Sequence, residues 1–293
     1  MKARMNKIAP DPTIRLLLER ASCRTFIKKR ITQDVMRTIL DCGAHAATGG
    51  NLQPYSVIVI RNQAVNTKLA ALCHQPFVGQ APANLLFCID LRRLERWARL
   101  MDAPYTARES FRHFWISFQD TIIAAQNICT AADALGLGSC YIGTVMESLP
   151  TLRRMFKLPQ GVLPVVLLTL GYPAKRPQAR RKLGPEIIAH HETYHELSDD
   201  ALLRAFEGKH PGFKLEITPQ RLRAFEQVCR KVGGREFATR SLARVKQQGY
   251  FNMAQLYFGL HYQADSMPDG NVKFLRQIES SGLGWFLTNK YQR

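Results

Sequence analysis

The sequence predicts a protein that mixes helices and strands, followed by a C-terminal part made of helices. Over the first 170 residues, stretches with an apolar stripe at helical spacing alternate with short apolar runs of strand length. Residues of the N-cap type stand just before several of the helical stretches. From Ser198 onward only helical patterns remain. A boundary is therefore expected between a domain over 13–197 and a helical extension over 198–293.

The helices are predicted from their start and stop signals. Asp11 is a good N-cap and Pro12 suits the first helical position, so a helix is expected from there to Arg20. Thr32 caps a second helix that ends near Gly43. Further helices are expected over residues 64–73, 91–118, 120–135 and 149–156, then after the caps Ser198 and Thr218, with Gly233-Gly234 ending the helix that Thr218 opens.

Four apolar runs have the length of buried strands. They cover residues 56–60, 83–90, 139–143 and 162–170. The glycines Gly136 and Gly138 separate a helix from the third of these strands. That order and spacing differ from the dinucleotide-binding fingerprint, in which a strand precedes the glycines and a helix follows them.

Composition favours a cytoplasmic globular protein. Of 293 residues, 46% are apolar and 22% charged, which is ordinary for a chain that forms a core. No apolar run approaches the roughly 20 residues that span a bilayer, and the N-terminus lacks the apolar block of a secretory signal. The seven cysteines are scattered without a CxxC pair, which indicates reduced thiols.

The net charge of +18 favours anionic partners such as phosphorylated cofactors. The basic residues are spread along the chain, with no zinc-finger spacing, no aromatic RNA-binding box and no long Lys/Arg block. We therefore expect neither nucleic acid nor a membrane as partner. A basic nucleic-acid-binding module without catalysis stays open as a rival class.

Arg20, Ser22 and Arg24 stand at every second position after the first helix. In an extended backbone such residues project from one face. Two guanidiniums, with their forked donors, and one hydroxyl suit a phosphate group. On these residues alone, a solvated basic strand is an equal alternative.

Two other segments suit a phosphorylated aromatic ligand. In the loop over residues 46–55, Gly49 and Gly50 let a backbone come close to a flat ligand. The amides of Asn51 and Gln53 can both donate to and accept from a heterocycle. The basic loop 174–182 is able to close over a phosphate. Taken singly, a plain connecting loop and a solvated charged loop are the alternatives.

A further motif indicates a different chemistry. His191, Glu192 and His195 match HExxH, which on a helix binds zinc with Glu as general base. Pro185 lies shortly upstream, Thr193 is β-branched, and no third ligand stands out. A zinc hydrolase is therefore kept only as a minor alternative.

Taken in order, these segments resemble the FMN-dependent nitroreductase family, in its branch of NADPH-dependent, oxygen-insensitive nitroreductases and flavin reductases. The resemblance covers roughly Thr13 to Tyr194. It is carried by residues 20–24, 49–54, 134–143, 158–159, 162–164, 170–173, 180–182 and 190–194. In this alignment the HExxH letters fall on a segment that binds no metal in the family, so no metal ligand is expected.

The resemblance implies a set of cofactor-binding residues. Arg20 and Ser22 would hold the FMN phosphate, and Arg24 would lie toward the N1/O2 edge of the ring. Thr48 and Asn51 would line the pocket from the partner subunit, and Gln75 would reach the ring. The backbone of Tyr141, Ile142, Gly143 and Thr144 would pass along its other side, and Arg180 and Lys182 would close on the phosphate.

The resemblance also implies the architecture and the activity. The fold would be α+β, with a nitroreductase-like central mixed β-sheet flanked by helices, in a homodimer with FMN at the interface. FMN would transfer hydride in a ping-pong cycle from NADPH or NADH to nitroaromatics, quinones or flavins, with no catalytic side chain required. The positive net charge favours NADPH. Enone reduction or dehalogenation by the same cofactor are the alternatives within the family.

Two departures from the family limit what is carried over. Thr48-Gly49-Gly50-Asn51 replaces the usual serine-rich loop, and the region after Tyr194 does not match the branch. The acceptor, the choice between NADPH and NADH, and the role of the chain after His210 therefore stay open.

Overall fold

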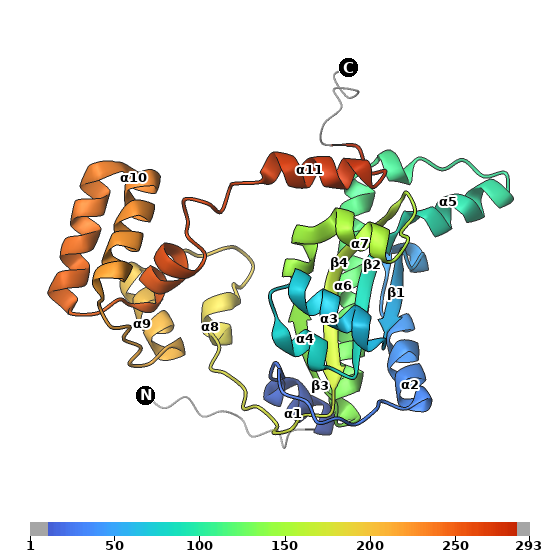
Figure 1. Cartoon of the computed structure of the whole chain (residues 1–293), viewed down its shortest axis with the longest axis horizontal. Coiled ribbons are helices and arrows are strands. Elements are labelled where there is room, and N and C mark those ends of the chain that lie inside the picture. Colours follow the sequence, from blue (N-terminus) through green and yellow to red (C-terminus); the bar gives the residue numbers. More distant parts are fainter. Residues whose placement is uncertain (1–10, 286–293) are drawn as a thin grey trace. The chain divides into compact units, whose positions relative to one another are not determined.

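The chain forms two compact units in a computed structural model, which describes residues 11–285 (Figure 1). The first unit holds the described residues up to Ala179 together with those from Val272 onward. The second unit is Arg180–Asn271. The sequence boundary at 197/198 assigned the whole C-terminal part to one extension. The contacts divide the described chain after 179 and again after 271, and the boundary at 197/198 stays a prediction.

A four-stranded sheet forms the centre of the first unit among the described residues, in the order β1-β2-β4-β3. The strands are β1 (Tyr55–Ile60), β2 (Ala83–Asp90), β3 (Gly138–Ile142) and β4 (Val162–Gly171). All three pairings are antiparallel, and a parallel bridge joins Ser22 to Ser139. The inner strands β2 and β4 are buried along their whole length, which explains their continuous apolar sequence. The α+β class is confirmed.

Helices cover both faces of this sheet (Figure 1). On one face lie α2 (Gln33–Ala44) and the long α6 (Phe111–Ala134), and their core with the strands includes Ile39, Phe87 and Ile128. On the other face lie α3 (Gln63–Leu72), α4 (Pro76–Gln80) and α7 (Leu149–Met155), whose core includes Leu69 and Leu86. The short α11 (Asn271–Ser280) adds Ile278 to the first of these cores.

The capping signals place the helix starts well. Asp11 accepts a hydrogen bond from the Thr13 backbone at the start of α1 (Pro12–Glu19), and Thr32 caps α2 in the same way. The helix expected over 91–118 is instead broken into α5 (Leu91–Leu100), a 3₁₀ turn η2 (Ala107–Glu109) and the start of α6. Pro104 disfavours helix at the residue before it, and the Ser110 hydroxyl begins a new helix by accepting from the His113 backbone.

The second unit is helical, as predicted. It contains α8 (Pro185–Ile188), α9 (Asp199–Lys209), α10 (Pro219–Gln248) and the π-helix η4 (Gln255–His261). Within α10 the backbone leaves helical geometry at Gly234, with φ 77° and ψ −173°, so two helical segments meet at the predicted stop. A small core around Phe225, Val245 and Phe251 holds the unit together. Within residues 11–285, no helix combines the length and the apolar character that crossing a membrane requires.

Candidate functional site

The Arg20–Arg24 segment runs beside β3 in extended conformation. Ser22 forms a bridge with Ser139, and the backbone N–H of Cys23 donates to the Ser139 carbonyl over 2.8 Å. Cys23 is only 1% exposed, so it faces the core. In an extended chain, neighbouring side chains point to opposite faces. Ser22 and Arg24 therefore point away from the core, and Arg20 lies on the same face, as predicted.

Glycine at position 138 permits this close approach. A Cβ atom there would lie 2.6 Å from Cys23 Cβ and 2.8 Å from Cys23 Sγ, closer than side-chain carbons pack. Any side chain at Gly138 would therefore push the Arg20–Arg24 segment away from β3.

The three polar side chains of the segment gather around one residue of β3. Burial raises the pKa of the Cys140 thiol, and the charges of Arg24 and Arg20 oppose that rise. The Ser22 hydroxyl likewise lowers the pKa of this thiol. The structure therefore brings Arg20, Ser22 and Arg24 together at the β3 edge of the sheet.

Arg20 carries a buried donor without an acceptor among the described residues, although, against the effect of burial, the Cys129 side chain interacts with the guanidinium and raises its pKa. Its Nε atom has no hydrogen-bond partner among the described residues, although the side chain is half-buried. Beside it, at the end of α6, burial raises the pKa of Asp133, while the charges of Arg176 and Arg20 lower it. The Arg176 Nη2 atom lies 3.6 Å from Asp133 Oδ1. An excess of positive charge with an unused donor suits an anionic group such as phosphate.

Arg24 connects this group to α4 and to the end of β3. Its guanidinium lies 5.8 Å from the centre of the Phe77 ring. Phe77 belongs to α4, whose N-cap is Gln75. The Thr144 hydroxyl donates to the Cys73 carbonyl over 3.3 Å, so the chain after β3 meets the turn before α4. Gly143 is exposed, and a Cβ there would find no atom within 4 Å.

We call these residues the β3-edge group: Arg20, Ser22, Arg24, Gln75, Tyr141, Ile142, Gly143 and Thr144. Its members come from three separate stretches of the chain, and contacts with β3 or with the turn before α4 bring them to one region of the first unit.

The loop with Thr48 and Asn51 lies on a different part of the molecule. The Gly49 N–H donates to both carboxylate oxygens of Asp120, near the middle of α6, at 3.2 Å each. Gly50 and Asn51 have φ of 60° and 56°, in the left-handed region that glycine and asparagine tolerate best. The loop is therefore held in a specific conformation by α6.

Arg93 fixes the chain just after this loop. Its Nη2 atom donates to the carbonyls of Gln53 at 2.5 Å and Tyr55 at 2.6 Å. Its Nη1 atom donates to the Ser56 hydroxyl at 3.3 Å. Because two of the three acceptors are backbone carbonyls, Arg93 restrains the path of the chain at Gln53 and Tyr55 whatever side chains those positions carry.

Within one chain, the loop and the β3-edge group are far apart. The loop contacts α6 at Asp120, and Arg20 lies beside Asp133 of the same helix. At 1.5 Å per residue these two positions on α6 are about 20 Å apart. The structure therefore gathers most of the predicted residues but leaves Thr48 and Asn51 elsewhere.

Comparison with known proteins decides which family has this arrangement. A model of the family described as Nitroreductase matches residues 17–172, more than half of the chain. The chain belongs to the nitroreductase family. A relative from Bacillus subtilis named FMN reductase (NADPH) is 30% identical over 190 residues, which cover 64% of this chain and 76% of that protein.

Two other proteins extend this nitroreductase-family likeness. An oxygen-insensitive NADPH nitroreductase of Salmonella typhimurium is 31% identical over 195 residues, covering 66% of this chain and 79% of that protein. A solved structure from Bacteroides fragilis is 26% identical, with a TM-score of 0.76, and covers 92% of this chain and 99% of that one. The resemblance inferred from the sequence motifs is confirmed.

Two predicted residues of this nitroreductase-family chain lie outside the first unit. Arg180 and Lys182 open the second unit, and both are exposed. Their neighbour Arg181 donates to the Gly208 carbonyl of that same unit, at 3.5 Å. The expected closure of Arg180 and Lys182 over a phosphate stays a prediction.

The HExxH letters do not form the helix that a zinc peptidase needs. Helix α8 ends at Ile188, and Glu192 has a φ of 62°. The His195 ring contacts the Thr193 hydroxyl at 3.2 Å instead of sharing a helical face with His191. The zinc hydrolase alternative is not supported, because the motif lacks the backbone geometry on which its chemistry depends.

Sequence reasoning missed the supporting residues Asp133, Arg176 and Arg93. Asp133 gave a weak signal, as one acid among the small residues of the 131–134 segment. Arg176 belongs to the basic loop already singled out, but its spacing does not say which residue it meets. Arg93 gave no signal, since its partners are backbone carbonyls some 40 positions away in the sequence.

Proposed function

We propose that the protein is an FMN-dependent NAD(P)H oxidoreductase that reduces nitroaromatics, quinones or free flavins. The observation that carries the proposal is the β3-edge group, in which the buried Nε of Arg20 has no partner among the described residues. It occurs in a chain of the nitroreductase family whose relatives include an FMN reductase that uses NADPH.

The residues present suit an FMN phosphate. Arg20 offers its unused buried donor, and Ser22 adds a hydroxyl on the same side of the segment. Asp133, the nearby carboxylate, already forms an ion pair with Arg176, so two arginines share one acid. We therefore assign the phosphate to Arg20 and Ser22.

The ring end is assigned to the remaining members of the group. FMN supplies the hydride chemistry, so the protein has to bind, orient and tune it. We assign Arg24 to the N1/O2 edge, where a cation would favour negative charge on the ring. Gln75 and the backbone of Tyr141, Ile142, Gly143 and Thr144 would line the ring, with open space at Gly143 for a close approach.

We also propose a homodimer in which Thr48 and Asn51 complete the site of the partner subunit. The separation of about 20 Å along α6 supports this, because one chain alone does not join the two groups. Helix α6 also exposes large apolar side chains, with Phe111 46%, Trp115 53% and Ile123 42% exposed. Such side chains are typical of a surface that another protein covers.

A cytoplasmic location is the third part of the proposal. All seven cysteines are free, and six of them are buried. Free, buried thiols fit a reducing compartment, in which disulfides do not form. Fractionation of cells that express the protein at native level tests this part directly.

One experiment on the purified protein tests the main proposal. Heat-denatured protein should release FMN fluorescence into the supernatant, and NADPH should bleach the yellow native protein under anaerobic conditions. A panel of nitroaromatics, quinones, flavins, enones and halogenated aromatics offered to the reduced protein then identifies the acceptor. The proposal is wrong if no flavin is released and added FMN does not bind.

A further inference from the structure

The first unit has a cavity that lies away from the β3-edge group. It has a volume of about 580 Å³ and is bounded by α5, by one end of the sheet and by the turn before β4. Val162, at the start of β4, lines it, whereas Leu170 near the other end pairs with Ser139 of β3. Eight residues along a strand correspond to about 26 Å, so the cavity lies at the opposite end of the sheet.

The cavity combines cations with apolar and aromatic surface. Arg92 and Arg96 line it from consecutive turns of α5, and neither forms an ion pair with any described residue. Trp97 and Leu100 lie beside them and are 59% and 69% exposed. The sheet contributes Ile58 and Val162. Guanidiniums next to an exposed indole suit a molecule with both an aromatic ring and an anionic group.

The carboxylate in the wall of the cavity is already engaged. Asp90 Oδ2 accepts from the Ser56 hydroxyl at 2.5 Å, and Oδ1 accepts from the Arg93 backbone at 3.0 Å. It forms no ion pair with Arg92 or Arg96, so its one negative charge faces two arginines and the cavity keeps a net positive charge. Its remaining lone pairs can accept from a ribose hydroxyl or an exocyclic amine.

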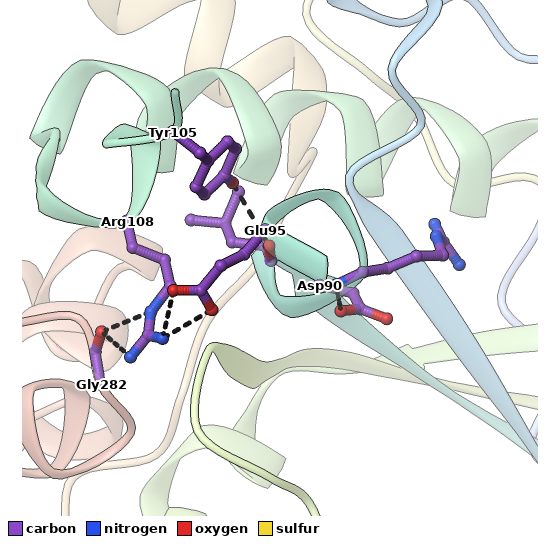
Figure 2. Close-up of polar contacts among 7 residues, drawn as sticks. Asp90, Glu95, Tyr105, Arg108 and Gly282 are labelled. Carbon is purple, nitrogen blue, oxygen red and sulfur yellow. Dashed lines mark hydrogen bonds and ion pairs between the residues drawn. The ribbon is translucent and has the colours of Figure 1, made fainter. Parts of the chain in front are cut away.

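Helix α5 is fixed in place, so the wall is formed before any ligand arrives. Figure 2 shows Arg108 between the Glu95 carboxylate, at 2.7 and 3.0 Å, and the Gly282 carbonyl, at 3.3 and 3.4 Å. The Tyr105 hydroxyl donates to the Leu91 carbonyl at 3.3 Å. Because Arg108 neutralises Glu95, the acid of α5, the positive charge of its arginines stays available to a ligand.

We propose that this cavity binds a nucleotide, with its base on Trp97 and the apolar end of the sheet and its phosphate on Arg92 and Arg96. The volume falls within the usual range for small-ligand sites, about 300–1,000 Å³. The ligand is either a free mononucleotide or the adenosine phosphate portion of a nicotinamide dinucleotide. The proposal does not rest on FMN binding, because no residue of the β3-edge group lines the cavity.

The test is AMP binding to the purified full-length protein, in its own oligomeric state, by titration calorimetry and tryptophan fluorescence. Adenosine and inorganic phosphate serve as half-ligand probes, and each should bind at least about tenfold more weakly than AMP. The double variant Arg92→Ala, Arg96→Ala should bind AMP about tenfold or more weakly, since charge-assisted phosphate contacts are removed. Trp97→Ala should weaken AMP and adenosine alike.

Arg99→Ala is the matched control, because Arg99 lies on the same exposed helix but does not line the cavity. It should bind AMP as the unmodified protein does, and circular dichroism should show α5 variants equally folded. If AMP raises the KM for NADPH, the dinucleotide is the natural ligand; if AMP binds without that effect, a free nucleotide is. The proposal is overturned if AMP fails to bind at millimolar concentration, or binds the double variant and the Arg99 variant equally.

Discussion

Arg176 Nη2 lies 3.6 Å from Oδ1 of Asp133, a side chain that is only 4% exposed. The other carboxylate oxygen has no hydrogen-bond partner among the described residues. Burial raises the pKa of Asp133, and the charges of Arg176 and Arg20 only partly offset that effect. The charged, buried carboxylate of Asp133 at the end of α6 therefore lowers the stability of the fold. It lies beside Arg20, which we assign to the phosphate.

Asp133→Asn should gain stability relative to the unmodified protein as the pH rises from about 4 to 7. A raised pKa means that the folded state binds the proton more tightly than the unfolded state does. The protonated form therefore stabilises the fold at low pH, and this contribution is lost as pH rises through the folded pKa. Asparagine has no such loss.

Urea unfolding of both proteins at several pH values measures the difference. Asp34→Asn, in which the replaced carboxylate is exposed in the first turn of α2, is measured alongside as a surface substitution of the same kind. A stability difference between Asp133→Asn and the unmodified protein that is constant with pH would contradict the assignment.

Arg20→Ala should retain FMN about ten- to a hundredfold less tightly. A charge-assisted hydrogen bond to phosphate contributes about 1.5–3 kcal/mol, and each 1.4 kcal/mol is tenfold in affinity. Arg20→Lys should bind FMN more tightly than Arg20→Ala and less tightly than the unmodified protein. Lysine keeps the positive charge but lacks the forked pair of N–H donors of the guanidinium. The measurement is FMN titration of the protein after its flavin has been removed.

Arg15→Ala is the control for that measurement, since Arg15 is exposed on α1, one helix turn before Arg20. It removes one positive charge without touching the β3-edge group. Equal FMN affinity of the Arg15 and Arg20 variants would show that the phosphate lies elsewhere.

The sequence predicted most elements of the first unit because their signals are local. Caps such as Asp11 and Thr32 act within one helical turn, and the inner strands β2 and β4 are apolar throughout. The break between α5 and α6 was missed because Arg and aromatic residues continue the helical pattern across it. Pro104 interrupts the helical stretch after α5, and the Ser110 cap starts α6 as a new helix.

The site was predictable as a set of segments but not as a geometry. The alternation of Arg20, Ser22 and Arg24 is a local pattern, and the structure places those side chains around Cys140. By contrast, Asp133 and Arg93 act through partners distant in the sequence, and no local pattern encodes such pairs. The family resemblance grouped Thr48 and Asn51 with the residues of the β3-edge group. Within a single chain these two residues lie far from that group.

Gly138→Ala should destabilise the protein by about 1–3 kcal/mol, because the new Cβ would overlap the buried Cys23 side chain. Gly143→Ala is the control for stability, since a Cβ there meets no atom within 4 Å and its φ of −81° suits alanine. Chemical unfolding of the two variants checks the difference. Equal stability would mean that the Arg20–Arg24 segment does not need its close contact with β3.

Mixed subunits test whether the site is shared between two chains. Arg20→Ala impairs the β3-edge group, and Thr48→Trp fills the space beside the loop; each variant alone should retain little FMN. In a homodimer with shared sites, a hybrid of the two has one site with both defects and one site with neither. Unfolding and refolding the variants together should therefore restore FMN to about a quarter of all sites, because half of randomly paired dimers are hybrids with one intact site each.

Flavin absorbance per subunit after removal of free FMN gives the readout. Refolding each variant by itself is the control, and mass determination by light scattering shows whether dimers form. If Thr48 and Arg20 served the same site within one chain, every site in the mixture would keep one defect, and no FMN would be regained. The result thus separates a shared site from a single-chain site, even if both variants fold perfectly well.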